Sequence, residues 1–252
     1  MQRGIVYVFT GKLHARMALI SLLTLRQVCD LPVVWVSSWP HLELFDLTGL
    51  NVSCRTPATQ PGFSEYQMSR YLKTQLPELV DFQQTLYLDS DTLIRYPIDG
   101  IWDWLEGADL SLRIDRMREL QQCRHATPDE KAYTLSRLPA NTPHYNAGVL
   151  LFQQNPTIRR LFQCWLAEWS VYRQIDQLAF LRACSAIRPN IKVLPERFNM
   201  IDVQEPDWPT RDAAIAHFAG RLPEMFMTQA AMMFPAIMEE FKDRCCKDIT
   251  CS

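Results

Sequence analysis

Two aspartates, Asp89 and Asp91, lie directly after an apolar run in the stretch TLYLDSDTLI, residues 85–94. The apolar run at residues 86–88 is typical of a buried strand, because apolar side chains fall on both of its faces. Carboxylates at the end of a buried strand are costly unless they are paired, hydrogen-bonded or bound to a cation. The spacing therefore predicts a divalent metal site at the carboxyl end of a central strand, where open α/β sheets bind ligands.

Other side chains suited to chemistry lie at the ends of predicted elements. His217 follows a predicted strand at residues 213–216, where it is either a structural histidine or a ligand for the same ion. Asp176 lies in the first turn of a predicted helix. It is either a partner for the helix dipole or, together with Gln177, a residue that faces the pocket.

Two further pairs of residues point to a ligand less directly. Asn146 and Gly148 lie at the start of a predicted strand, which indicates either an ordinary turn or a backbone that something approaches closely. Arg70 and Lys73 lie on a predicted helix over residues 64–76 that leads towards the acidic strand. Their charges form either a solvated helix face or cations that point at a bound phosphate.

Strands and helices alternate along the chain, which predicts an α/β fold with a mostly parallel sheet and crossover helices. The polar segment at residues 115–143 has weak periodicity and predicts a long excursion, either a lid or binding loop or a surface without a role. The other predicted elements are strands at 5–9, 33–36, 86–88, 108–112, 148–152 and 191–194, and helices at 14–28, 157–172, 176–184 and 229–242, the last broken near Pro235.

Composition limits the class of protein. The 252 residues, 48% hydrophobic and 21% charged, suit one large α/β domain. A net charge of −2 without a block of one sign predicts no nucleic-acid partner. No apolar run reaches the roughly 18 residues of a membrane span, and no signal peptide is evident, so we expect a cytoplasmic protein. Five scattered cysteines predict buried thiols, and Cys245, Cys246 and Cys251 lie in a polar tail.

Five segments together resemble the nucleotide-sugar-dependent glycosyltransferases of the GT-A fold, most closely family 8. That family includes glycogenin and the bacterial galactosyltransferases of lipopolysaccharide assembly. The segments, in the family's order, are IVYVFTGKLH, LYLDSDTLI, YNAGVLLF, IDQLAF and IAHFAGR, and they span residues 5–221. The resemblance implies a single Rossmann-like domain over residues 1–244, with a mostly parallel central sheet flanked by helices, and a cysteine-containing tail at 245–252.

The resemblance also implies roles for individual residues. Asp89, Asp91 and His217 would hold Mn²⁺ or Mg²⁺ against the diphosphate of a nucleotide sugar, a UDP-sugar by family habit. Asp176 and Gln177 would be catalytic, under the reacting sugar, in a transfer that retains the anomeric configuration. The resemblance leaves open whether the acceptor is a glycan, a lipid or a protein. It also leaves open the oligomeric state and whether the protein contacts a membrane surface. Residues expected to contact the donor are Thr10, Lys73, Ser90, Asn146, Gly148, Gly220 and Arg221.

This chemistry explains the residue types, but the chain departs from the family in two places. A divalent ion stabilises the negative charge of a leaving diphosphate, and a cation from Lys73 or Arg221 would add to that effect. The family usually has Lys-Pro-Trp after its histidine and glycine, whereas this chain has GRLPEM at residues 220–225. We therefore expect Arg221 to replace the missing lysine. Gly11 also stands where a polar side chain is common.

Two alternative functions follow from the same residues. A protein with this fold that binds nucleotide sugars without turnover is consistent with the altered segment at 220–225. A haloacid-dehalogenase-like phosphatase carries DxDx(T/V) on a similar strand, but the fifth position here is Leu93, and the motif comes late in the chain.

Overall fold

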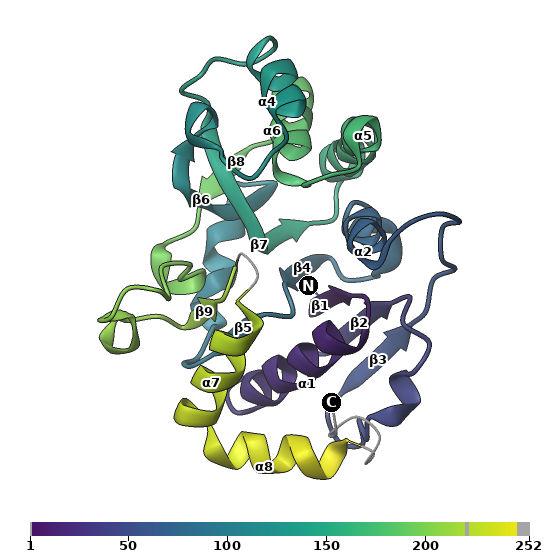
Figure 1. Ribbon diagram of the computed structural model, residues 1–252, viewed down its shortest axis with the longest axis vertical. Helices are drawn as coiled ribbons and strands as arrows, with labels where there is room; N and C mark the ends of the chain where they lie inside the picture. Colours follow the sequence, from purple (N-terminus) through teal and green to yellow (C-terminus); the bar gives the residue numbers. More distant parts are fainter. Residues whose placement is uncertain (1, 220–221, 246–252) are drawn as a thin grey trace.

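The computed structural model describes residues 2–219 and 222–245. Within them a seven-stranded sheet runs through the middle of the molecule in the order β3-β2-β1-β4-β7-β6-β8, and β5 and β9 form a separate small sheet (Figure 1). The strands are β1 (Arg3–Phe9), β2 (Val33–Ser37), β3 (Val52–Arg55), β4 (Gln84–Leu88), β5 (Thr92–Ile94), β6 (Leu110–Glu119), β7 (Pro143–Gln153), β8 (Ile191–Val193) and β9 (Ile215–His217).

The central sheet is mostly parallel, as the sequence predicts. Strand β7 pairs antiparallel with both β4 and β6, and the remaining pairings of this sheet are parallel. The α-helices are α1 (Lys12–Arg26), α2 (Glu65–Lys73), α3 (Leu76–Leu79), α4 (Pro128–Leu135), α5 (Pro156–Tyr172), α6 (Gln177–Ile187), α7 (Pro223–Met233) and α8 (Pro235–Arg244).

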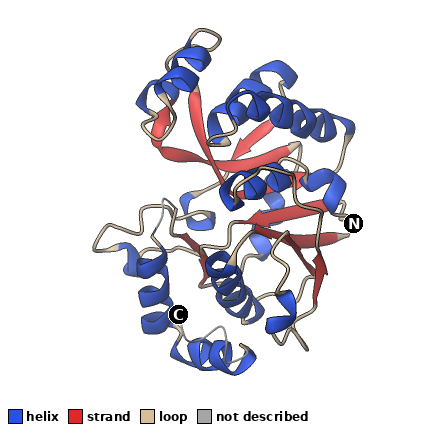
Figure 2. Ribbon diagram, turned by 45° about the vertical axis from the view of Figure 1, so that its right-hand side comes forward, coloured by secondary structure: helices blue, strands red, loops and turns tan. Residues whose placement is uncertain are grey.

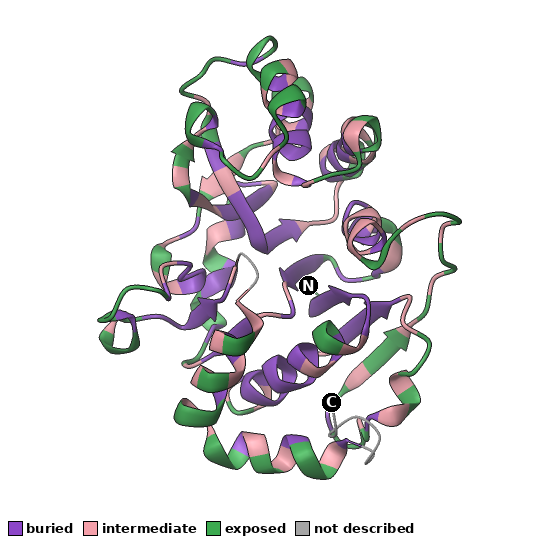
Figure 3. Ribbon diagram, viewed as in Figure 1, coloured by how far each residue is buried: buried purple, intermediate pink, exposed green. Residues whose placement is uncertain are grey.

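Alternating side chains of the central strands fill two cores, one on each face of the sheet. In β1, Ile5, Tyr7 and Phe9 belong to the core that α1, α7 and α8 complete. Val6 and Val8 belong to the core that α2, α5 and α6 complete. Helices therefore cover both faces, and the strands between them are largely buried (Figures 2 and 3).

The small sheet joins two distant parts of the chain. After β4 ends at Leu88, a turn at residues 89–91 leads into β5. Thr92 of β5 lies opposite His217 of β9 in an antiparallel register. The Phe218 amide also donates to the Asp91 carbonyl oxygen at 2.9 Å. This pairing brings His217 from the far end of the chain to the acidic turn.

The structure corrects the prediction of a long excursion at residues 115–143. β6 continues to Glu119 and β7 begins at Pro143, so the excursion is shorter at both ends. The apolar pattern ends at Leu112, but the ladder continues because the Ile114 region of β6 still pairs with β7 across register shifts. The segment between these strands contains a short 3₁₀ helix, Leu120–Gln122, and α4.

The C-terminal segment is helical and broken where the sequence predicts. α7 starts at Pro223, earlier than expected, and gives way to α8 at Pro235. Cys245 forms a backbone bridge with Phe45, and the rest of the predicted tail, with Cys246 and Cys251, lies outside the described residues. No helix in the described part of the chain has the length and apolar character that crossing a membrane requires.

Candidate active site

Asp89, Asp91 and His217 converge at the end of β4. His217 Nε2 lies 3.4 Å from Asp91 Oδ1 and 3.6 Å from Asp89 Oδ2. One ligand atom from each residue can be chosen so that all three lie within 4.8 Å of one another. The turn after β4 supplies the two carboxylates, and β9 supplies the imidazole. The set can hold one divalent cation.

A relay of amides orients the His217 ring. Its Nδ1 lies 3.0 Å from Asn199 Oδ1, and Asn199 Nδ2 donates to Asn146 Oδ1 at 3.1 Å. Because an amide oxygen can only accept, Nδ1 carries a proton, and the lone pair of the neutral ring is on Nε2. That lone pair faces the two aspartates, which is the orientation that a metal-binding histidine requires.

The same groups shift one another's pKa. Burial disfavours a charged His217, but Asp91 and Asp89 outweigh burial and raise its pKa above the ordinary value. Burial also opposes ionisation of Asp91, yet His217 lowers the pKa of that carboxyl. The three groups thus stabilise an imidazolium beside carboxylates. A cation that binds here has to displace the ring proton.

Gly148 makes this close approach possible. A Cβ atom at this position would run into the His217 ring and lie 2.7 Å from Asp89 Oδ2. The Gly148 backbone also accepts a hydrogen bond from the Asp89 amide at 2.7 Å and donates one to Asn146 Oδ1 at 3.1 Å. The backbone of β7 is therefore approached closely, and the side chains that approach it are those of Asp89 and His217.

Lys73 lies inside the site and not on a solvated helix face. Its side chain is 8% exposed, and Nζ lies 3.2 Å from Asp176 Oδ2 and 3.5 Å from Asp89 Oδ1. Burial would lower the pKa of Lys73, but Asp176 and Asp89 raise it, so the ammonium stays charged. The other cation of the helix, Arg70, instead stacks over the ring of Tyr66.

Asp176 and Gln177 face the same region from the start of α6. The Asp176 side chain makes no capping hydrogen bond and pairs with Lys73 instead. Gln177 Nε2 donates to Asp115 Oδ2 at 3.2 Å and to the Tyr145 carbonyl oxygen at 3.1 Å. Both amide protons are thereby engaged, which leaves the electron-rich Oε1 as the remaining polar atom.

Thr10 and Ser90 also lie in buried positions. The Thr10 hydroxyl donates to the Glu65 carbonyl oxygen at 2.7 Å, which ties the end of β1 to the start of α2. The Ser90 hydroxyl lies 3.2 Å from His14 Nδ1 in α1. Gly220 and Arg221 lie outside the described residues.

Comparison with known proteins assigns the family. The family model described as glycosyl transferase family 8 matches residues 46–222, more than half of the chain. The chain belongs to glycosyl transferase family 8. The resemblance seen in the sequence is thus confirmed, and membership argues against the phosphatase alternative. No curated protein matches the chain individually in sequence.

Solved glycosyltransferases share the fold of this family 8 protein. Galactosyltransferase LgtC, solved with donor and acceptor sugar analogues, has a TM-score of 0.61 at 16% identity, over 92% of this chain and 96% of that one. Mouse xyloside xylosyltransferase 1 has a TM-score of 0.58 at 15% identity, over 88% and 98% of the two chains. GlyE of Streptococcus pneumoniae TIGR4 has a TM-score of 0.58 at 15% identity, over 97% and 64%. At these identities the likeness establishes the single GT-A domain.

Two residues of the family 8 site lack any family motif in the sequence. Asn199 is fully buried and orients His217, and Asp115 accepts from both Asn146 Nδ2, at 3.0 Å, and Gln177. The signal for Asp115 was its position just beyond a predicted strand. Nothing in the local sequence pattern distinguishes Asn199.

A cleft of about 470 Å³ lies beside the candidate site. It is lined by the outer half of β6 and by residues from Val193 to Asp202, and Asp115 belongs both to the cleft and to the network around Gln177. Arg113 crosses the cleft to Asp202, with a separation of 2.9 Å between Nη2 and Oδ2. The polar residues along the cleft are Arg113, Asp115, Arg116, Arg118, Glu196 and Asp202.

Proposed function

We propose that this glycosyltransferase transfers a sugar from a UDP-sugar, with retention of configuration, and uses Mn²⁺ or Mg²⁺ bound to Asp89, Asp91 and His217. The convergence of these three side chains within 4.8 Å carries the proposal. Family membership supports sugar transfer, and the choice of UDP rests on the resemblance of the motifs to family 8.

The residues present fit a hard divalent cation. Carboxylate oxygens with one imidazole suit Mn²⁺ or Mg²⁺ better than a thiolate-seeking metal. Gly148 leaves the room that a side chain would occupy, and Asn199 fixes the His217 lone pair towards the acids. When bound, such a cation supplies Lewis-acid stabilisation to the negative charge of the leaving diphosphate.

Lys73 adds a fixed positive charge to this region. Its ammonium is buried and is held by Asp89 and Asp176, so it is already oriented before the donor binds. A preorganised cation stabilises developing charge in a water-poor site more effectively than one that must reorient. We assign Lys73 to the diphosphate of the donor.

Gln177 and Asp176 are the proposed catalytic residues. Both protons of the Gln177 amide are held by Asp115 and the Tyr145 carbonyl oxygen, so Oε1 is the atom left to face positive charge. Glycosyl transfer passes through an oxocarbenium-like centre, which an electron-rich oxygen stabilises. The Asp176 carboxylate, with its charge partly balanced by Lys73, adds to that stabilisation.

The acceptor is proposed to enter through the cleft along the outer half of β6. Asp115 connects this cleft to Gln177, so a hydroxyl group bound there is close to the proposed catalytic amide. The charged lining suits a polar acceptor such as a glycan, alone or carried by a lipid or protein.

Calorimetry with UDP tests the metal site directly. We expect UDP to bind the wild-type chain at least about tenfold more tightly with Mn²⁺ than with a chelator, since a cation held by Asp89, Asp91 and His217 would attract the phosphates. Asp91→Asn should remove this enhancement. Asp81→Asn is the matched control, because the Asp81 side chain is 83% exposed and pairs with Arg55. Equal UDP affinity with and without Mn²⁺ contradicts the proposal.

A separate outcome distinguishes the binding-protein alternative. Metal-dependent UDP binding without hydrolysis or transfer from any nucleotide sugar would favour a protein that binds donors without turnover. That result would leave the metal site intact but remove the proposed roles of Asp176 and Gln177.

A further inference from the structure

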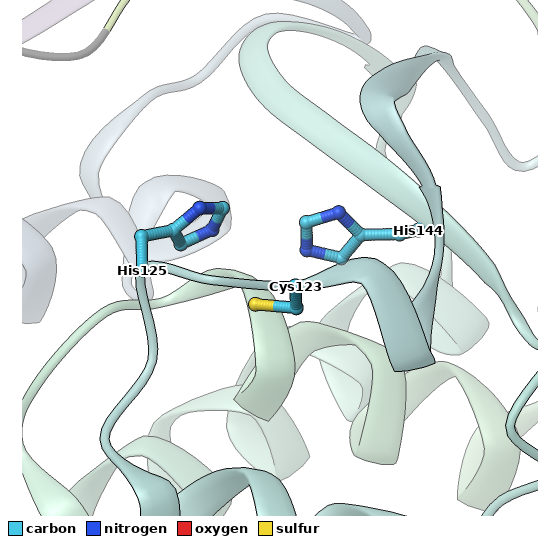
Figure 4. A group of neighbouring side chains, drawn as sticks. All are labelled: Cys123, His125 and His144. Carbon is cyan, nitrogen blue, oxygen red and sulfur yellow. The ribbon is translucent and has the colours of Figure 1, made fainter.

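A second cluster of metal-binding side chains lies at the entrance to the segment between β6 and β7. Cys123 follows the 3₁₀ helix Leu120–Gln122, His125 is two residues further on, and His144 is the second residue of β7. The sulfur and one nitrogen from each ring lie within 4.8 Å of one another. Figure 4 shows the two rings turned towards each other across the sulfur, with 5.4 Å between their centroids.

His144 presents an unused lone pair in this cluster. Its Nδ1 lies 2.9 Å from the Met117 carbonyl oxygen, which can only accept, so Nδ1 carries the ring proton. Nε2 is therefore unprotonated in the neutral ring. His144 is fully buried, and Nε2 has no hydrogen-bond partner among the described residues. A buried, unsatisfied nitrogen is costly unless something binds it.

The spacing is close to that of a tetrahedral site. Zinc bonds of about 2.3 Å to sulfur and about 2.0–2.1 Å to nitrogen put ligand atoms roughly 3.3–3.6 Å apart. Because the ligand atoms lie within 4.8 Å of one another, the cluster needs to close by at most about 1.5 Å. His125 is exposed and can supply that movement by rotating its side chain. Cys123 and His144 are buried and already fixed.

The surrounding contacts hold the cluster in place. Lys131 of α4 donates to the backbone carbonyl oxygens of Gln121 and Cys123, at 2.6 and 2.7 Å. The Met117 carbonyl oxygen, 2.9 Å from His144 Nδ1, orients this ring, and Asp115 Oδ1 lies further away, at 3.9 Å. A carbonyl partner of this kind orients a histidine ligand.

We propose that Cys123, His125 and His144 form a second metal site, selective for a borderline-soft divalent cation such as Zn²⁺ and distinct from the aspartate site. Thiolate and imidazole ligands favour Zn²⁺, whereas the carboxylate-rich set at Asp89 and Asp91 favours Mn²⁺ or Mg²⁺. Three protein ligands leave the fourth tetrahedral position for water or for a basic group of a bound ligand.

The cluster has an electrostatic consequence at Cys123. Burial opposes ionisation of the thiol, but the neighbouring His125 and His144 outweigh burial and lower its pKa to about 5.

The site would couple the β6–β7 segment to the proposed catalytic residues. Asp115 lies beside His144 and also accepts a hydrogen bond from Gln177. An ion held by His125 and His144 would therefore restrain the surroundings of Asp115. This inference does not depend on the identity of the nucleotide donor.

Cobalt binding to the full chain tests the site. Co²⁺ replaces Zn²⁺ in such sites, and a bound thiolate gives a thiolate-to-cobalt charge-transfer absorption in the near ultraviolet. We expect this band in the wild-type protein and its loss on addition of Zn²⁺. Cys123→Ser should abolish the band, and His125→Ala should weaken Co²⁺ binding at least about tenfold.

Two controls assign the band to this cluster. Cys164→Ser alters a half-buried thiol elsewhere, and Asp91→Asn alters the aspartate site, so both variants should keep the band. A wild-type protein without the band, or a band that persists in Cys123→Ser, overturns the proposal. Since His125 is exposed, its alanine variant should fold even if Cys123→Ser does not. Unchanged Co²⁺ affinity in folded His125→Ala also overturns the three-ligand site.

Discussion

Gly148 illustrates at the residue scale how tightly the proposed metal site is packed. Gly148→Ala should weaken Mn²⁺-dependent UDP binding by about 10–100-fold, because the added Cβ displaces the His217 ring and presses on Asp89. Calorimetric Kd values for UDP in the presence of Mn²⁺ measure the effect. Gly100→Ala is the control, since its Cβ would come no closer than 3.9 Å to Phe198. Equal losses in both variants would point to a general loss of stability.

Lys73 offers a second test at this scale. Lys73→Met keeps most of the buried side-chain volume but removes the ammonium between Asp89 and Asp176. We expect kcat/KM for transfer or donor hydrolysis to fall about 100-fold, as when one preorganised charge stabiliser is lost. Lys242→Met removes an equal charge from a side chain that is 64% exposed and should leave kcat/KM unchanged. If Lys73→Met retains the wild-type kcat/KM, Lys73 does not stabilise the leaving diphosphate.

The sequence predicted the residues proposed to bind the cation, but it did not point to the residues that orient them. Asp89 and Asp91 stand out because two acids follow an apolar strand, and the family motif supplied His217 as their partner. Asn199 and Asp115 act through hydrogen bonds to other side chains, and such contacts depend on strand register and loop paths. Single-sequence patterns carry no information on those long-range contacts.

At the scale of elements, helix α2 positions Lys73, and its capping box fixes where the helix starts. The Ser64 hydroxyl accepts from the Gln67 amide at 3.2 Å, and Gln67 Oε1 accepts from the Ser64 amide at 3.0 Å. Ser64→Ala should lower the free energy of unfolding by about 1 kcal/mol. Urea denaturation measures this loss. Ser170→Ala, at an exposed position within α5, should change the value by less than about 0.5 kcal/mol. Equal stability of Ser64→Ala and wild type would contradict a stabilising cap.

Element boundaries were predictable where apolar periodicity is strong and not where polar residues continue a strand. The capped start of α2 and the break at Pro235 follow from local residue chemistry, and both agree with the structure. β6 extends to Glu119 although its outer half carries charged side chains. Pairing with β7 determines that extension, and the apolar pattern alone ends too early.

At the scale of the whole molecule, a buried ion network joins α4, α5 and α6. Arg182 lies 3.3 Å from Glu130 and 2.7 Å from Glu168, and Glu130 Oε2 is left without a hydrogen-bond partner in the described part of the chain. Burial raises the pKa of Glu130 above its ordinary value of 4.5, and Arg182 offsets this only in part. The folded state therefore holds the proton of Glu130 more tightly than the unfolded state does.

This shift predicts a pH dependence of stability. A raised carboxyl pKa means that Glu130 contributes less to folding as pH rises through and above 4.5. The free energy of unfolding of the wild type should therefore decline relative to Glu130→Gln between about pH 4 and pH 7. Denaturation curves of the two proteins at the same series of pH values give the difference in their free energies of unfolding. The contributions of all other titrating groups cancel in that difference. A constant difference, or one with the opposite slope, would contradict the raised pKa.

The central claim is that one metal site at the end of β4 makes the chain a nucleotide-sugar transferase. Metal-dependent hydrolysis of UDP-sugars tests it most directly, because hydrolysis needs the donor site but no acceptor. We predict that the wild type hydrolyses at least one UDP-sugar with Mn²⁺ or Mg²⁺. Asp91→Asn should reduce that rate at least about 100-fold, and Asp81→Asn should not. An equal rate of hydrolysis in the presence of a chelator, or an unchanged rate in Asp91→Asn, would contradict this prediction.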